Sequence, residues 1–333
     1  MNILLTGSTG FLGKQVLSRL VKNPDIQKIY VVIRKAHSHP SPKVKILKFD
    51  LSRTFNLPIE VGKLDAVIHL AASYDLRASY ADNYLHNVCA TMNLLSALEG
   101  QDDNLTFHYS STYAVLNGSS DLDSCEEPID FNPSRIIPYA YTKALNERII
   151  EKSRFRTFIY RLGVLVAETE TGKIEKLDGP YMIMNFLYRL KKILKYFPSV
   201  PLPINPLAFL PLVPVNVAAE VFVASLFLSV KGSRIFGVFD PESILIQDFT
   251  QLMWDNFSFP GKPNYRNFLT FKQAARFDRF LPVPASFLEF GQNSPSLKNP
   301  NFLQTFKHSS VPRFHTYAPK FFQGFHEYQE RNG

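Results

Sequence analysis

Cysteine is scarce in this chain. Its 333 residues include only Cys89 and Cys125, too few for a disulfide framework and without the spacing of a metal-ligand cluster. The sequence also lacks an internal repeat of fixed period and a low-complexity tract, which argues against a solenoid or a flexible linker. These absences favour a globular protein without a bound metal, and such sparing use of cysteine is typical of a reducing cytoplasm.

An uninterrupted apolar run long enough to cross a membrane is also missing. Residues 208–230 come nearest, but four residues interrupt them: Pro211, Pro214, Asn216 and Glu220. These residues are costly in a bilayer, so we expect no transmembrane segment, but a proline-containing loop and a buried helix from about Val217. Residues 2–5 already have a strand-like pattern, which leaves no room for a signal peptide before the folded domain.

Acidic residues are outnumbered by basic ones. The chain has 37 Lys and Arg against 29 Asp and Glu, which gives a net charge of +8 and a pI near 9.3. This balance suits an anionic partner, such as a phosphorylated cofactor, an acidic carrier protein, a membrane surface or a nucleic acid. No nucleic-acid-binding motif accompanies the basic residues, so we expect no nucleic-acid partner.

Short apolar runs alternate with helical patterns in the first half of the chain. Residues 13–21, 87–98 and 139–151 carry apolar side chains at helical spacing. The β-like runs are residues 2–5, 28–33, 44–49, 66–70, 106–109 and 157–162. Strands that alternate with helices predict an α/β fold in which helices cover both faces of a parallel sheet, the doubly wound Rossmann arrangement.

A glycine turn follows the first predicted strand. The run Thr6-Gly7-Ser8-Thr9-Gly10-Phe11-Leu12-Gly13 opens the first predicted helix. In such a turn, Gly7 allows a tight bend, Gly10 lets backbone N–H groups approach a pyrophosphate, and Gly13 permits close helix packing. The helix N-terminus faces the phosphates, so the turn predicts a dinucleotide site.

The second predicted strand ends on basic residues. Arg34 and Lys35 stand where an NAD site usually offers an acidic residue to the ribose hydroxyls. Arg34 can hold a 2′-phosphate instead, which favours NADP(H), although it can also be a solvated charge at a strand end. Asp50, after the third strand, is a candidate acceptor for the adenine amino group.

Tyr139 and Lys143 are one helical turn apart. Both side chains therefore lie on one face of the predicted helix, where an ammonium can lower the pKa of a phenol. This makes Tyr139 a candidate proton donor or acceptor. The run Tyr109-Ser110-Ser111-Thr112 stands upstream of the pair.

With these motifs, the first 240 residues or so resemble the extended short-chain dehydrogenase/reductase superfamily. The landmarks are the turn at 6–13, His69-Leu70-Ala71-Ala72, Asn87, Ser110-Ser111-Thr112 and the Tyr139/Lys143 pair. The resemblance implies that Tyr139 is the acid/base, that Lys143 binds the nicotinamide ribose and lowers the tyrosine pKa, and that Thr112 bonds the substrate oxygen. We interpret the nearby Tyr141 and Tyr113 as packing or substrate-lining residues.

The resemblance also implies a set of cofactor contacts. They are Gly7, Thr9, Gly10, Phe11, Leu12, Gly13, Arg34, Asp50, Leu51, Leu70, Ala71, Ala72, Asn87, Tyr139 and Lys143. On this basis we expect an NADP-binding Rossmann domain at 1–165 and a smaller, mostly helical substrate-binding region at 166–333. A further strand near 234–238 is expected to return to the Rossmann sheet.

Within the superfamily, the later motifs resemble the branch of fatty acyl-CoA reductases and thioester reductase domains. These motifs are Arg161-Leu162-Gly163-Val164 through Thr171-Gly172, Leu177 to Tyr181, Leu212 to Val215 and Tyr317-Ala318-Pro319. Leu162 stands where proline is common in that branch, and Ala167 where glycine is common. The asparagine-containing turn of sugar-nucleotide epimerases is absent after this strand.

This branch implies reduction of an acyl thioester, carried by CoA or a carrier protein, or of a lipid-like carbonyl. Two alternatives share the sequence features: a sugar-nucleotide or sterol-type dehydrogenase, and a non-catalytic NADP-binding sensor or scaffold. The resemblance also allows a homodimer built on the helices that carry Asn87 and Tyr139.

A later helical stripe leaves two interpretations open. Apolar residues recur on one face at Phe186, Leu190, Ile193, Leu194 and Phe197, whereas Arg189, Lys191, Lys192 and Lys195 lie largely off it. The stripe can pack in the core and leave a solvated basic face. Alternatively, the basic face docks CoA phosphates, an acidic carrier protein or anionic lipid, which would be a peripheral membrane contact.

Overall fold

A computed structural model describes residues 1–35, 38–75, 77–118, 124–129, 137–202, 204–259, 261–265, 298–307 and 310–332. The chain divides into two compact units. Unit 1 comprises residues 1–162, 215–238 and 299–310, and unit 2 comprises residues 163–214, 239–298 and 311–333. The chain passes from one unit to the other several times, so neither unit is a continuous segment.

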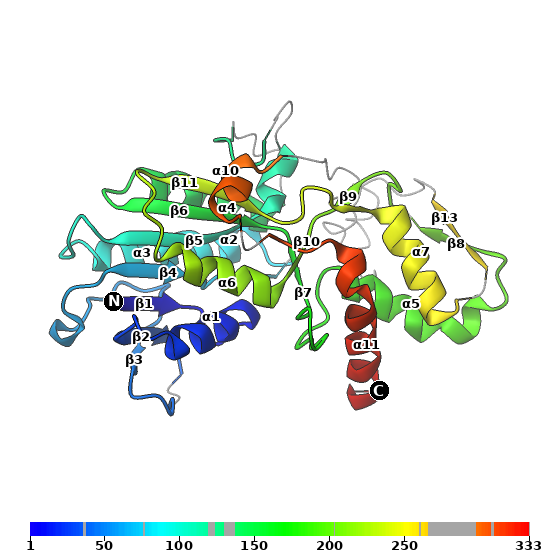
Figure 1. The fold of residues 1–333 in the computed structure, drawn as a ribbon, viewed down its shortest axis with the longest axis horizontal. Coiled ribbons are helices and arrows are strands. Elements are labelled where there is room, and N and C mark those ends of the chain that lie inside the picture. Colours follow the sequence, from blue (N-terminus) through cyan, green and yellow to red (C-terminus); the bar gives the residue numbers. More distant parts are fainter. Residues whose placement is uncertain are drawn as a thin grey trace. The chain divides into compact units, whose positions relative to one another are not determined.

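Unit 1 is built on a seven-stranded sheet in the order β11-β6-β5-β4-β1-β2-β3, with every neighbouring pair parallel (Figure 1). The strands are β1 (Asn2–Thr6), β2 (Lys28–Ile33), β3 (Val44–Lys48), β4 (Ala66–His69), β5 (Thr106–Thr112), β6 (Arg156–Leu162) and β11 (Arg234–Val238). The predicted α/β Rossmann class is confirmed. The strand order reverses between β1 and β4, and ligands of such sheets bind at the carboxyl ends beside that point.

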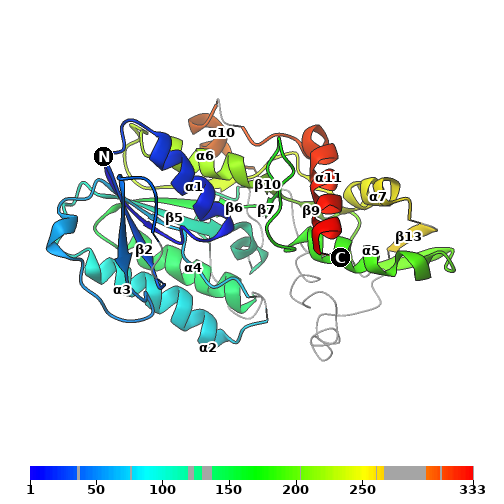
Figure 2. The same ribbon diagram turned by 90° about the horizontal axis from the view of Figure 1, so that it is seen from below.

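Helices cover both faces of this sheet (Figure 2). On one face lie α1 (Phe11–Lys22) and α6 (Val215–Ser225), and on the other lie α2 (Tyr80–Asn83), α3 (Ala90–Ala97) and α4 (Pro138–Glu151). A π-helical turn at Tyr84–Cys89 joins α2 to α3. Strands covered on both faces need apolar side chains on both sides, which explains why Leu4, Val67 and Phe107 are fully buried.

The observed bounds refine several predictions. Strand β5 extends to Thr112, three residues beyond the predicted run, so the serine-rich motif forms the end of the strand itself. Helix α6 begins at Val215, directly after Pro214, and β11 lies at the edge of the sheet beside β6. In the described ranges, no helix combines the length and hydropathy needed to cross a membrane.

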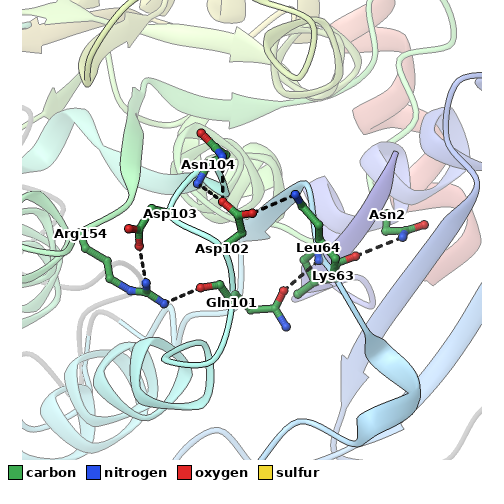
Figure 3. Close-up of polar contacts among 8 residues, drawn as sticks. All are labelled: Asn2, Lys63, Leu64, Gln101, Asp102, Asp103, Asn104 and Arg154. Carbon is green, nitrogen blue, oxygen red and sulfur yellow. Dashed lines mark hydrogen bonds and ion pairs between the residues drawn. The ribbon is translucent and has the colours of Figure 1, made fainter.

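Polar side chains tie together the amino ends of the strands (Figure 3). The Gln101 amide accepts from Leu64 N at 2.9 Å and donates to Gly62 O at 2.9 Å. Lys63 pairs with Asp102 at 2.9 Å. Arg154, between α4 and β6, donates to Gln101 O at 2.6 Å and also pairs with Asp103. These contacts hold together the loops at the amino edge of the sheet.

Unit 2 contains three helices and three small two-stranded sheets in its described residues. The helices are α5 (Pro180–Leu194), α7 (Ile246–Phe257) and α11 (Phe314–Asn332). The strand pairs are β7 (Val164–Val166) with β10 (Leu212–Pro214), β8 (Ser199–Leu202) with β13 (Lys262–Tyr265), and β9 (Phe209–Leu210) with β12 (Ile244–Leu245). Aromatic side chains from the three helices form much of its core, among them Tyr181, Phe249, Phe257, Phe314, Phe321 and Phe325.

Candidate active site

The glycine turn brings the backbone of β1 against the segment that follows β4. Gly7 has a φ of +74°, and a Cβ atom on it would lie 2.5 Å from Ala71 N. A Cβ atom on Gly13 would lie 2.0 Å from Gly7 O. Any larger residue at either position would therefore displace backbone atoms. The first turn of α1 packs directly on the bend, as a dinucleotide fold requires.

The N-terminus of α1 is open to an anion. Gly10, its N-cap, provides no side-chain cap, and the first turn has no acidic residue. Thr9 and Gly10 are exposed, and Phe11 is half-buried. The first N–H groups of a helix have no partner within the helix and carry a partial positive charge. This turn therefore fits the pyrophosphate of a nicotinamide dinucleotide.

Arg34 and Asp50 lie near each other at the carboxyl ends of β2 and β3. Both are exposed, and Phe49 N donates to Ile33 O at 3.1 Å to hold the two ends together. Hydrogen bonds from Ser52 lower the pKa of Asp50, and the charge of Arg34 adds to this effect. Asp50 is thus an anionic acceptor beside a guanidinium, which is the arrangement expected around the adenosine half of a dinucleotide.

Asn87 links the segment after β4 to α4. Its Oδ1 accepts from Ser73 N at 2.7 Å, and its Nδ2 donates to Thr142 Oγ1 at 3.1 Å. Thr142 in turn donates to Tyr139 O at 2.8 Å. Asn87 is almost fully buried, and these bonds join the backbone at Ser73 to the first turns of α4.

A buried histidine continues this network toward the glycine turn. His69 Nδ1 lies 2.7 Å from Thr6 Oγ1, and His69 Nε2 lies 3.0 Å from Thr91 Oγ1. Thr91 donates to Asn87 O at 2.9 Å. Burial, with a smaller contribution from Lys143, lowers the pKa of His69 to about 3. The imidazole is therefore neutral and serves as a hydrogen-bonded spacer, not as an acid.

Tyr139 lies in the first turn of α4 and contacts a residue that sequence reasoning missed. Its ring meets the ring of Tyr74 edge to face, with centroids 5.1 Å apart. Burial, and secondarily Tyr74, raise the pKa of Tyr139. The expectation that Lys143 lowers this pKa does not describe the structure. The phenol is protonated at neutral pH, which is the form that can donate a proton.

Lys143 is buried one turn further along α4. Its Nζ donates to Ser110 O at 2.6 Å and lies 4.7 Å from the centroid of the Tyr109 ring. Burial lowers its pKa to about 7, while Glu147 acts in the opposite direction. The one hydrogen bond to Ser110 leaves further N–H donors on the amine, which suits contact with the hydroxyls of a ribose.

Thr112 ends β5, two residues after the carbonyl that Lys143 contacts. Its Oγ1 accepts from Ala114 N at 3.2 Å, and the side chain is half-buried. The hydroxyl proton is therefore available for another acceptor. Thr112, Tyr139 and Lys143 thus come from the end of β5 and the start of α4, two elements that pack on each other.

A buried ion pair lies behind this site. Arg161 Nη2 is 2.7 Å from Glu147 Oε2, and Ser111 Oγ donates to the same carboxylate. Arg161 Nη1 also donates to Cys125 O and Glu127 O, at 2.7 Å each. Glu147 was missed by sequence reasoning. The sequence did contain an indication of it, because Glu147 follows Lys143 by one helical turn and therefore lies on the same face of α4.

The remaining predicted contacts are distributed along the carboxyl edge of the sheet. Leu51 O accepts from Asn93 Nδ2 at 2.9 Å, and Leu70 and Ala71 are half-buried whereas Ala72 is exposed. In the part of the chain that the structure describes, no cluster of His, Cys, Asp and Glu could hold a metal ion. The candidate site includes backbone N–H groups, hydroxyls, the phenols of Tyr74 and Tyr139, the amine of Lys143 and the charged pair Arg34 and Asp50.

Known proteins resemble this chain in sequence. The family model described as Male sterility protein matches residues 5–58 and 56–222. Human fatty acyl-CoA reductase 1 is 26% identical to this chain over 82% of the chain and 62% of that protein. A polyketide synthase-nonribosomal peptide synthetase of Aspergillus clavatus is 34% identical over 45% of this chain and 4% of its own length. The chain thus spans less than two thirds of these relatives.

Solved structures share its fold. The terminal R domain from the myxalamid PKS-NRPS biosynthetic pathway has a TM-score of 0.76 at 19% identity, covering 98% of this chain and 90% of that chain. MoeE5 in complex with UDP-glucuronic acid and NAD has a TM-score of 0.70 at 15% identity, covering 98% of this chain and 100% of its own. The fold is that of an extended short-chain dehydrogenase/reductase. Within that superfamily, this chain belongs to the Male sterility protein family, and the resemblance found in its sequence is confirmed.

Proposed function

We propose that this protein is an NADPH-dependent reductase of acyl thioesters, with a fatty acyl-CoA or a carrier-bound acyl group as substrate. The observation that carries the proposal is that Thr112 ends β5 while Tyr139 and Lys143 lie on the first turns of α4, which packs on β5, in a member of this family. The name of the human relative, fatty acyl-CoA reductase 1, supports the same reaction.

The bound dinucleotide would supply a hydride to the carbonyl carbon. Thr112 Oγ1 would orient the carbonyl oxygen, and the phenol of Tyr139 would donate its proton to that oxygen as negative charge develops. The resulting hemithioacetal then breaks its C–S bond, giving an aldehyde and a free thiol. Because burial raises the pKa of Tyr139, the phenol holds its proton until an acceptor of this kind is present.

Lys143 would position the nicotinamide ribose during this transfer. Its amine is fixed on Ser110 O at 2.6 Å, and its remaining donors would hold the nicotinamide ribose. Arg34 supports the choice of NADPH, since a guanidinium binds a phosphate through charge-assisted hydrogen bonds.

We assign substrate binding to residues 166–333, and dinucleotide binding to the Rossmann part at 1–165 with β11. The core of unit 2 is rich in aromatic and aliphatic side chains, a composition that suits an acyl chain better than a sugar. A homodimer is supported by exposed apolar side chains on the α2–α3 segment of unit 1: Tyr80, Tyr84, Leu85 and Met92.

The test is the loss of NADPH absorbance with a long-chain acyl-CoA, measured for the wild type, Tyr139→Phe and the matched control Tyr141→Phe. We expect Tyr139→Phe to lose on the order of 10²-fold or more in turnover, with NADPH affinity retained, and Tyr141→Phe to stay near wild type. Equal turnover of all three would remove Tyr139 from the reaction. NADPH binding without turnover on CoA-bound and carrier-bound thioesters would favour a sensor or another carbonyl substrate.

A further inference from the structure

Helix α5 in unit 2 leaves large apolar side chains uncovered. Its inner face is buried in the aromatic core through Tyr181, Met184, Leu187 and Leu194. On its outer face, the exposed fractions are 38% for Phe186, 55% for Ile193, 75% for Tyr196 and 52% for Phe197. Contiguous exposed apolar groups of this size mark interaction surfaces.

These side chains form a stripe along one face. Phe186, Ile193 and Phe197 are spaced by seven and four residues, so they lie one above the other on a helix. The turn continues past the end of α5, since Tyr196 N donates to Ile193 O at 3.1 Å and Phe197 N to Leu194 O at 3.0 Å. Core packing, the first interpretation of this stripe, describes Leu194 and the half-buried Leu190. Phe186, Ile193 and Phe197 are exposed instead.

Cations border the stripe. Arg189 and Lys192 are exposed and stand three residues apart, in the row of the helix next to Ile193. Lys195 Nζ lies 4.9 Å from the centroid of the Tyr196 ring. No acidic residue occurs between Asp178 and Glu220. The outer face of α5 is therefore apolar, and the charged residues of α5 itself are all basic.

We propose that this surface, which we call the α5 face (Phe186, Arg189, Lys192, Ile193, Tyr196 and Phe197), docks the protein on an anionic lipid surface. Amphipathic helices of this kind lie in the plane of the membrane interface, with their apolar side chains below the headgroups and their cations at the phosphates. Tyr196 and Phe197 supply aromatic rings that favour the interfacial depth.

Charge and shape favour lipid over an acidic protein. Each basic side chain near a negative membrane surface strengthens binding about fivefold, and the two bordering cations act together with the apolar groups. The Tyr196 side chain is the most exposed of the set and lies at the end of the helix, where it can enter a fluid interface without a matching pocket. The inference depends on α5 alone and is independent of the proposed reductase reaction.

The test is flotation of the whole chain with vesicles. One set contains phosphatidylcholine alone, and the other contains equal amounts of phosphatidylcholine and phosphatidylserine. We expect binding to the anionic vesicles, weakened by added salt, and little binding to the neutral ones. Failure to bind anionic vesicles would overturn the proposal, and binding only to an acidic carrier protein would assign the α5 face to a protein partner instead.

Two double variants separate the contributions. Arg189→Gln/Lys192→Gln is expected to reduce partitioning about 30-fold, from about fivefold for each charge. Ile193→Ser/Phe197→Ser is expected to reduce it at least about tenfold. The matched controls are Lys173→Gln/Lys320→Gln and Leu207→Ser, which change exposed residues of unit 2 outside the α5 face. Equal partitioning of controls and α5 variants would overturn the assignment.

A fluorescent reporter tests contact directly. The chain has one tryptophan, Trp254, which is 4% exposed and so should not respond to lipid. In a Tyr196→Trp variant we expect a blue shift on anionic vesicles and quenching by brominated acyl chains. If the protein bound but the emission of the introduced indole did not change, another surface would be the one that touches the membrane. Unchanged thermal unfolding would show that each variant remains folded.

Discussion

Arg161 and Glu147 form a fully buried ion pair, with Arg161 Nη2 2.7 Å from Glu147 Oε2. The same carboxylate accepts from Ser111, which lies between Ser110 and Thr112. The pair therefore supports the strand end from which two residues of the candidate site project. Removal of either charge of this pair should therefore lower the stability of unit 1 and also disturb the chemistry of the candidate site.

Glu147→Gln tests this pair. Breaking a buried pair by removing one partner leaves an uncompensated charge, which costs about 3–5 kcal/mol. We expect a corresponding fall in the free energy of unfolding in urea. Glu151→Gln, an exposed position on the same helix, is the control and should change stability little. An equal free energy of unfolding for the two variants would indicate that groups other than Glu147 neutralise the charge of Arg161.

Lys143 makes stability depend on pH. Burial lowers its pKa from 10.5 to about 7, so between these values the unfolded chain binds a proton that the folded chain does not. The contribution of Lys143 to the free energy of unfolding should therefore rise as the pH increases from about 7 toward 10. Urea titrations at several pH values should show a shallower rise for Lys143→Met than for the wild type. Parallel curves would indicate that Lys143 is not desolvated.

Gly13→Ala should damage the cofactor turn. The added methyl group would lie 2.0 Å from Gly7 O, so the first turn of α1 must move away from the bend that receives the pyrophosphate. We expect at least about a tenfold loss of dinucleotide affinity by isothermal calorimetry. Gly100→Ala is the matched control, since a Cβ atom there meets nothing within 4 Å. Wild-type affinity in Gly13→Ala would mean that the dinucleotide binds elsewhere.

Arg34→Ser tests cofactor choice. Loss of charge-assisted hydrogen bonds to a 2′-phosphate should weaken NADPH binding by about 10- to 100-fold, with little change for NADH. The comparison uses titrations of both dinucleotides into the wild type, the variant and a control, Lys45→Ser. The Lys45 side chain lies on β3 and is exposed. An equal effect on NADH and NADPH would show that Arg34 does not read the 2′-phosphate.

Leu85→Glu/Met92→Lys tests the proposed homodimer. These side chains are 44% and 50% exposed and lie seven residues apart in the α2–α3 segment, and buried charges would oppose association there. Light scattering should show a dimer for the wild type and a monomer for the variant. Ile59→Lys, at a side chain that is 98% exposed and is not part of this segment, should leave the mass unchanged. A monomeric wild type would contradict the proposal.

Local motifs predicted the parts of the site that depend on neighbouring residues. The glycine turn opens α1, Tyr139 and Lys143 share one face of α4, and Arg34 and Asp50 end adjacent strands. Each of these features depends on the spacing of residues along the chain or on which predicted strand a residue follows, and both can be read from the sequence. Sequence also indicated the apolar stripe of α5, although it did not show which of its members are buried.

Contacts between distant segments could not be predicted in the same way. The edge-to-face contact of Tyr74 with Tyr139 joins residues on different elements, and no periodicity links them. The raised pKa of Tyr139 and the lowered pKa of Lys143 follow from burial, which emerges only when α4 packs on the sheet. Glu147 was visible as a helical neighbour of Lys143, but its partner Arg161 lies on another strand.

The interleaving of the two units has a consequence for biosynthesis. The buried carboxylate of Glu126 accepts hydrogen bonds from Gly237 N at 2.9 Å and from Phe302 N at 2.8 Å, and all three residues belong to unit 1. A ribosome must therefore translate residues 163–214 of unit 2 before β11, the edge strand of unit 1, and residues 239–298 before α10 (Pro300–Thr305). Until β11 has been translated, the edge of β6 in the nascent chain has no neighbouring strand. Unpaired strand edges are prone to aggregate, and chaperones would have to shield this one.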